Sequence, residues 1–150
     1  MTDVNLYETP PISSAESNFL ISSGTTPELI ELYKKARAII LPYGKIEVWA
    51  TRNYLSFKHP YGRNDERIGT LVNISFNKNS MILAFNMRKS TPSDPTNLLR
   101  ETNSHGVCNY YGIIKNEDDL SGLSKLIEQA IYCVSHKHRI VRINGKFITI

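Results

Sequence analysis

The chain has few cysteines, no long apolar segment and no basic residue among its first 30 positions. Two cysteines in 150 residues are too few for a disulfide framework, so we expect reduced thiols and a cytoplasmic location. No apolar run approaches the ~20 residues that a transmembrane helix needs. Residues 1–17 also lack the basic and apolar regions of a secretory signal. We therefore predict neither a signal peptide nor contact with a membrane.

Charge is distributed unevenly along the chain. Residues 1–30 contain four acidic side chains and no Lys or Arg. All 18 basic residues, and the other ten of the 14 acidic ones, lie in residues 31–150, which therefore carry a formal charge of +8. A basic body attracts anionic partners such as nucleic acid, nucleotides or acidic protein surfaces. The alternative is that this charge serves solubility alone.

Motifs of the common catalytic classes are absent as well. There is no Walker-type glycine loop and no G-x-S-x-G elbow. His105 and Cys108 would be neighbours only in a helix, and Gly106 and the strand pattern that follows argue against one. The His-Lys-His-Arg segment at 136–139 places cationic groups beside its histidines, which disfavours a metal. We predict no catalytic residue, no cofactor and no metal site, with an enzyme kept as a third alternative.

Three regions differ in composition and pattern. Residues 1–25 are rich in Ser, Thr, Pro and Asn without periodicity, which predicts an N-terminal arm anchored by Phe19–Ile21. Residues 26–134 alternate between helical and strand patterns and are expected to form one α+β domain. Residues 135–150 are expected to add a C-terminal β-hairpin, because the Asn-Gly pair at 144–145 between two alternating runs is typical of a type I′ turn.

Two helices and five strands are expected within the domain. Residues 26–41 begin with a capping threonine and a proline, and residues 117–134 begin with acidic side chains that suit the helix dipole. Strand patterns occupy residues 45–50, 53–59, 67–76, 81–88 and 109–115. We predict a mostly antiparallel, five-stranded meander sheet with the two helices packed on one face. The predicted core includes Leu29, Ile40, Phe57, Val72, Ile74, Leu83, Phe85, Ile127 and Ile131.

Four pieces of this domain resemble an uncharacterised family of small α+β domains labelled "predicted transport protein". The pieces are "IELYKKARAIIL", "ATRNYLSFKH", "SHG" and "DLSGLSKLIEQAI", and the resemblance covers about residues 26–134. Family members occur alone or appended to larger proteins, including restriction-like ones. In the family a glycine-rich segment follows the loop histidine, whereas Cys108 and Asn109 stand inside that segment here. The family has no established reaction, so the resemblance implies a fold rather than a function.

Aromatic and basic side chains are interleaved in residues 49–63. Aromatic rings stack on bases, and cations hold phosphates. In a strand, Tyr54 and Lys58 share one face, while Leu55 and Phe57 take the other. We therefore predict a non-catalytic binding module for an anionic ligand, either nucleic acid or a nucleotide. The alternative is that these aromatic residues only build the core. The predicted ligand contacts are Arg52, Tyr54, Lys58, Arg63, His105 and Arg139.

The two ends of the chain suggest a different function. Long polar arms and lone hairpins suit strand addition or exchange between copies. The alternative is therefore a small viral or mobile-element interaction protein that inhibits a host protein. In that case residues 1–25 and 135–150 would bind the protein partner or form a homo-oligomer. Deletion of residues 1–25 should then separate the hypotheses, because ligand binding by the core is expected to survive it.

Overall fold

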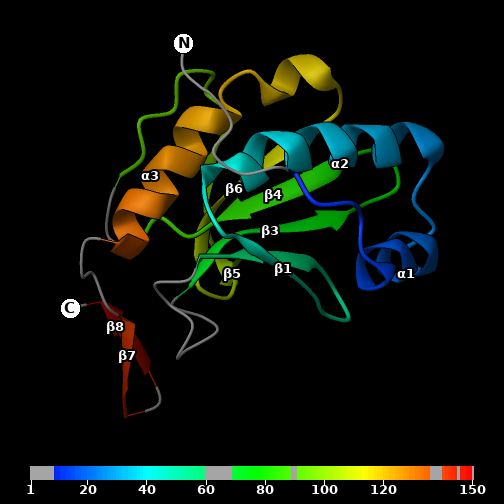
Figure 1. The fold of residues 1–150 in the computed structure, drawn as a ribbon. Coiled ribbons are helices and arrows are strands. Elements are labelled where there is room, and N and C mark those ends of the chain that lie inside the picture. The colour runs from blue at the N-terminus through cyan, green and yellow to red at the C-terminus, as the bar shows by residue number, and fades with distance from the viewer. Residues whose placement is uncertain (1–8, 60–68, 89–90, 136–139, 145, 150) are drawn as a thin grey trace.

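The computed structural model describes residues 9–59, 69–88, 91–135, 140–144 and 146–149 (Figure 1). Within these residues, an antiparallel six-stranded sheet packs against three α-helices, and a separate two-stranded hairpin follows. The predicted α+β class and antiparallel sheet are confirmed. The predicted counts of five strands and two helices are wrong, since the described residues contain one more of each. None of the described helices is long and apolar enough to cross a membrane.

The extra helix lies in the segment expected to be an arm. The α-helices are α1 (Ser14–Ser22), α2 (Pro27–Ile40) and α3 (Leu123–Ser135), with 3-10 turns η1 (Leu41–Tyr43) and η3 (Glu117–Leu120). A capping box starts α1, in which Ser13 and Glu16 each accept a backbone hydrogen bond from the other. Thr26 caps α2 and Pro27 is its first residue, as predicted. The predicted helix 117–134 is instead interrupted between η3 and α3.

The sheet extends the predicted meander by one edge strand. Its strands are β1 (Glu47–Ala50), β2 (Leu55–Lys58), β3 (Thr70–Phe76), β4 (Met81–Phe85), β5 (Arg100–His105) and β6 (Cys108–Ile114). They lie in the order β1-β2-β3-β4-β6-β5, with every neighbouring pair antiparallel. The pairing shifts between Phe57 and Lys58 in β2 and between Glu101 and His105 in β5. Such irregularities bend a strand and increase its twist.

The C-terminal hairpin consists of β7 (Ile140–Ile143) and β8 (Lys146–Thr149). Ile143 pairs with Lys146, so two residues connect the strands, as the Asn-Gly pair predicts. Asn144 has a φ of 52°, in the left-handed region that such a turn requires. The hairpin is a sheet of its own and does not extend the six-stranded one.

The core lies between the sheet and the helices. Apolar side chains of α1, α2 and α3 join those of β2, β3 and β4 in one cluster, so the three helices cover the same face of the sheet (Figure 1). Eight of the nine predicted core residues are buried, and Ile131 packs at the edge of the cluster. Phe19 and Leu20 anchor α1 as predicted, whereas Ile21 is 76% exposed and points away from the core.

A buried ion pair also ties α1 to α2. Arg37 donates from Nε and Nη2 to the two carboxylate oxygens of Glu16, at 2.7 and 3.0 Å. The Tyr33 hydroxyl donates to the same carboxylate, and Arg37 also donates to the carbonyl oxygens of Pro10 and Pro11. Burial alone raises the pKa of Glu16, but these hydrogen bonds and the guanidinium charge outweigh it and hold the pKa below its usual value. The network therefore keeps Glu16 ionised inside the fold.

Candidate binding site

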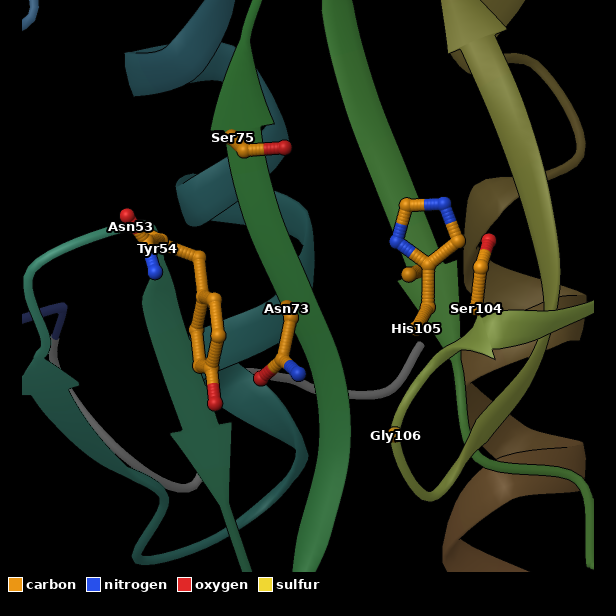
Figure 2. Close-up of a pocket in the computed structure, with 8 residues that line it drawn as sticks. Asn53, Tyr54, Asn73, Ser75, Ser104, His105 and Gly106 are labelled. Carbon is orange, nitrogen blue, oxygen red and sulfur yellow. The ribbon is translucent and has the colours of Figure 1, made fainter.

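The face of the sheet that carries no helix is lined mainly by polar and aromatic side chains. Strand alternation turns Leu55 and Phe57 into the core and leaves Ser56 and Lys58 on the opposite face. On β3, Asn73 projects to this same side. Figure 2 views this face, and the helices lie behind the strands. The register places one row of residues across all six strands: Trp49, Ser56, Asn73, Ala84, Tyr111 and Arg100.

Two adjoining hollows open on this face. One has a volume of about 400 Å³ and the other about 330 Å³, and both are lined by Tyr54, Asn73, His105 and Gly106. We call the joined hollow the sheet pocket. The lining side chains on which the argument depends are Trp49, Tyr54, Ser56, Lys58, Asn73 and His105. A ligand of nucleotide size fits a concave site of this volume.

The turn between β5 and β6 forms one wall of the sheet pocket. His105 pairs with Cys108 across this turn, and Gly106 adopts a φ of 64°, which disfavours any residue with a side chain. The His105 ring lies 5.5 Å from the Tyr111 ring, between ring centroids. No strand was predicted for residues 100–105, yet they form β5, which carries His105 to the pocket.

A lysine and a tryptophan form the opposite wall. Lys58 Nζ lies 5.2 Å from the centroid of the Trp49 ring, within range of a cation–π interaction, and donates to Thr70 Oγ1 at 2.9 Å. The Trp49 indole N–H donates to Glu47 at 2.9 Å. Glu47 is also the register partner of Lys58, but it does not line the pocket. Among the described residues that line the sheet pocket, Lys58 is the one Lys, Arg, Asp or Glu.

Two oxygen atoms at the floor of the pocket are buried without a hydrogen bond. Ser56 Oγ and Asn73 Oδ1 have no hydrogen-bond partner among the described residues, and Ser56 is only 1% exposed. The Asn73 amide nitrogen donates to Cys108 Sγ at 3.5 Å. Ser56 and Asn73 are direct partners across β2 and β3, so the two oxygens belong to one patch of the floor.

Cys108 lies beside this floor as a neutral thiol. The side chain is fully buried, and burial raises its pKa to about 12. A thiol needs to ionise to act as a nucleophile. At neutral pH the Cys108 side chain therefore packs as a small apolar group, while His105 contacts the ring of Tyr111.

Three of the six predicted contacts meet in the sheet pocket. Tyr54 directly precedes β2, Lys58 ends β2, His105 ends β5, and all three line one cavity. Arg52 is exposed in the turn between β1 and β2 and does not line it, and the predicted contacts at 63 and 139 lie outside the described residues. Asn73 and Ser56 were not among the predicted contacts. Strand alternation places both side chains on the face of the sheet that carries no helix. That their oxygens lack a hydrogen-bond partner follows only from the structure.

No protein-family model, no curated protein and no solved structure matches this chain. The resemblance of residues 26–134 to the "predicted transport protein" family therefore stays a prediction, and the site is interpreted from its own residues.

Proposed function

We propose that this chain is a cytoplasmic, non-catalytic binding module whose sheet pocket takes an anionic ligand with a planar ring, either a nucleotide or a nucleic acid. The observation that carries the proposal is the wall where the Lys58 ammonium lies over the Trp49 ring. It combines a positive charge with an aromatic surface on the lining of one cavity. These are the two groups that bind a phosphate and a base.

The charges around the pocket support an anionic ligand. A phosphate that reaches the Lys58 ammonium gains a charge-assisted hydrogen bond. This ammonium, which donates to Thr70 Oγ1, lines the pocket together with the Trp49 ring. The formal charge of +8 on residues 31–150 adds attraction at longer range.

The rings around the pocket support a planar ligand. Trp49 and Tyr54 come from β1 and from the residue before β2, and His105 faces them from β5. Each stacked base contributes roughly 1–3 kcal/mol in sites of this kind. An open site on a sheet face accepts either a single nucleotide or one base of a longer strand.

Replacing Lys58 with glutamine should weaken binding of adenosine monophosphate and of a short single-stranded DNA about five- to tenfold, because the substitution removes the charge that holds the phosphate. For the single-stranded DNA, the slope of the logarithm of affinity against the logarithm of salt concentration should decrease in magnitude by about one, the value for one phosphate contact. Fluorescence anisotropy across a salt series measures both quantities. The control is Lys125→Gln, an exposed lysine of α3. Equal affinity of Lys58→Gln and wild type, or binding that ignores salt, would refute the electrostatic part.

We propose the interaction protein as a second candidate, a small viral or mobile-element protein that inhibits a host protein. Two features favour it: Ile21 is a large apolar residue exposed on α1, and the hairpin forms a sheet apart from the main one. Deleting residues 1–25 is a poor test, because it also removes Phe19, Leu20 and the partner of Arg37 from the fold.

A single substitution on the exposed side of α1 tests the second candidate more cleanly. If α1 mediates oligomerisation or partner binding, Ile21→Asp should lower the native mass measured by light scattering or abolish capture of the partner. The matched control is Asn18→Asp, which adds the same charge at another exposed position of α1. Unchanged mass and unchanged partner binding in both variants would leave nucleotide binding as the better proposal.

A further inference from the structure

The sheet pocket is elongated along β3. Thr70 lines the larger hollow, Ser75 lines the smaller one, and Asn73 lines both. All three residues belong to β3, and a strand rises about 3.3 Å per residue, so the lining extends roughly 17 Å from Thr70 to Ser75. That length exceeds one nucleotide. A single nucleotide therefore fills only part of the pocket.

The two ends of the pocket differ in charge. At the Thr70 end, the Lys58 ammonium donates to Thr70 Oγ1 and lies over the Trp49 ring. At the other end, the described residues that line the smaller hollow alone are Asn53, Ser75, Ala84 and Ser104. None of these four carries a charge, whereas their amide and hydroxyl groups donate and accept hydrogen bonds. The first end thus suits a phosphate, and the second suits the sugar and base of a nucleoside.

Two rings stand where the hollows meet. Tyr54 and His105 each line both hollows, and Figure 2 shows them on opposite sides of Asn73, with Ser75 further along β3. Both rings belong to half-buried residues, so a ligand in either hollow reaches part of their surface. Sites for single-stranded nucleic acid place aromatic side chains where successive bases stack on them. A base on either side of this junction therefore has a ring within the lining of its hollow.

We infer that the sheet pocket binds two consecutive nucleotides of a single strand. The phosphate and base of the first nucleotide lie against Lys58 and Trp49, and the second nucleoside occupies the smaller hollow. The inference rests on the proposed function, because it names the length and form of the ligand for the same site. A free dinucleotide and an internal segment of a longer strand share this chemistry. A duplex does not, because its bases are already stacked on one another.

A length series with the full chain tests the second position. Isothermal titration calorimetry should give about tenfold tighter binding of the 5′-phosphorylated deoxyadenosine dinucleotide than of deoxyadenosine monophosphate, because the second base gains a stacking surface. The trinucleotide should bind within about threefold of the dinucleotide, because its third base lies beyond the lining. A hexanucleotide forms a second arm. If it binds at least as tightly as the dinucleotide, a strand segment is the ligand, and if it binds more weakly, a free dinucleotide is.

A dinucleotide without its second base separates stacking from charge. This ligand has the same phosphates as the intact dinucleotide but an abasic sugar at the second position. Its affinity should fall to within about twofold of that of the mononucleotide, because only the missing base fills the smaller hollow. Equal affinity of the abasic and intact dinucleotides would overturn the inference, because the added phosphate alone would then explain the gain.

The substitution Ser104→Leu connects the second base to the smaller hollow. Ser104 is exposed on β5 and lines this hollow alone, so a larger side chain there takes up its space without entering the core. The ratio of dinucleotide to mononucleotide affinity should fall from about ten to below about three. The control is Asn103→Leu, which adds the same side chain at the neighbouring exposed position, beside a different hollow. An equal ratio in the two variants would overturn the assignment of the second nucleotide to the smaller hollow.

The two proposals fail in different ways. If the mononucleotide and the dinucleotide bind equally, and Lys58→Gln weakens both, the inference is wrong while the proposed function stands. If no mononucleotide, dinucleotide or longer strand binds, both the inference and the proposed function are wrong. An affinity that rises by the same factor with every nucleotide from the second to the sixth would also overturn the inference, because the described lining has room for two.

Discussion

Replacing Arg37 with methionine should lower the free energy of unfolding by about 3–5 kcal/mol, because it leaves the Glu16 carboxylate buried without its cation. Glu16 and Arg37 are both nearly inaccessible to solvent and share two hydrogen bonds. The substitution also leaves the carbonyl oxygens of Pro10 and Pro11 without their donor. Urea unfolding monitored by circular dichroism measures the loss, and the variant should fold at low denaturant with a reduced midpoint.

Matched variants separate the buried pair from charge in general. Lys34→Met removes an exposed cation of α2 that pairs with Glu31, and should cost at most about 0.5 kcal/mol. The double variant Glu16→Leu with Arg37→Met removes both charges and should recover most of the stability. A loss in Arg37→Met no larger than that in Lys34→Met would contradict a buried, ionised pair.

The pH dependence of unfolding provides a second check on the same network. The pKa of Glu16 is lower in the folded chain than in the unfolded one, so the carboxylate stabilises the fold at every pH above its unfolded pKa of about 4.3. This contribution is lost as the pH falls from there through the folded pKa. Wild-type stability should therefore decrease below about pH 4.5 more steeply than that of the double variant.

Truncating Phe57 to alanine should cost about 3–5 kcal/mol, because it opens a cavity at the centre of the core. Phe57 is fully buried on β2, and its ring packs edge-on against Tyr33 with 6.3 Å between ring centroids. It also lies between Ser56 and Lys58, so the same strand carries the core on one face and the pocket on the other. Chemical denaturation of the variant gives the loss directly.

The control for Phe57 is another large apolar residue of the same sheet. Ile113 on β6 is 38% exposed, and Ile113→Ala should cost less than about 1 kcal/mol, because solvent already reaches its side chain. Nucleotide affinity measured at low denaturant should remain within about threefold in Ile113→Ala. If both variants lost a similar free energy of unfolding, the result would contradict a core that lies between the sheet and the helices.

The parts of the fold that the sequence predicted correctly carry side-chain patterns of their own. The alternation along β2 assigned Phe57 to the core and Lys58 to the other face, and the threonine and proline at the start of α2 marked its first turn. β5 was missed because its residues, Arg100–His105, are mostly polar and exposed, so pairing with β6 holds the strand rather than an apolar face. Backbone pairing of this kind leaves no periodic signal in the sequence.

Contacts between distant parts of the chain explain why α1 and part of the pocket were not predicted. α1 is stabilised by the buried pair of Glu16 with Arg37, which lies 21 residues further along the chain. The local sequence around Glu16 does not predict such a contact. The pocket itself was predictable only in part. Alternation gave Tyr54 and Lys58, but the unpaired state of Ser56 and Asn73 depends on how β2 and β3 align and on the packing above them.

The strand order has a mechanical consequence for the pocket. Trp49 on β1 and His105 on β5 belong to the two outermost strands of the six, yet both line one cavity. In a flat sheet those strands would lie about 24 Å apart, since neighbouring strands are spaced by about 4.8 Å. The sheet is therefore curved around the pocket, and the shifts in pairing in β2 and β5 bend those strands locally. The width of the pocket thus depends on the curvature of the sheet, and substitutions in the core on the opposite face can change that width without altering any residue that lines the pocket.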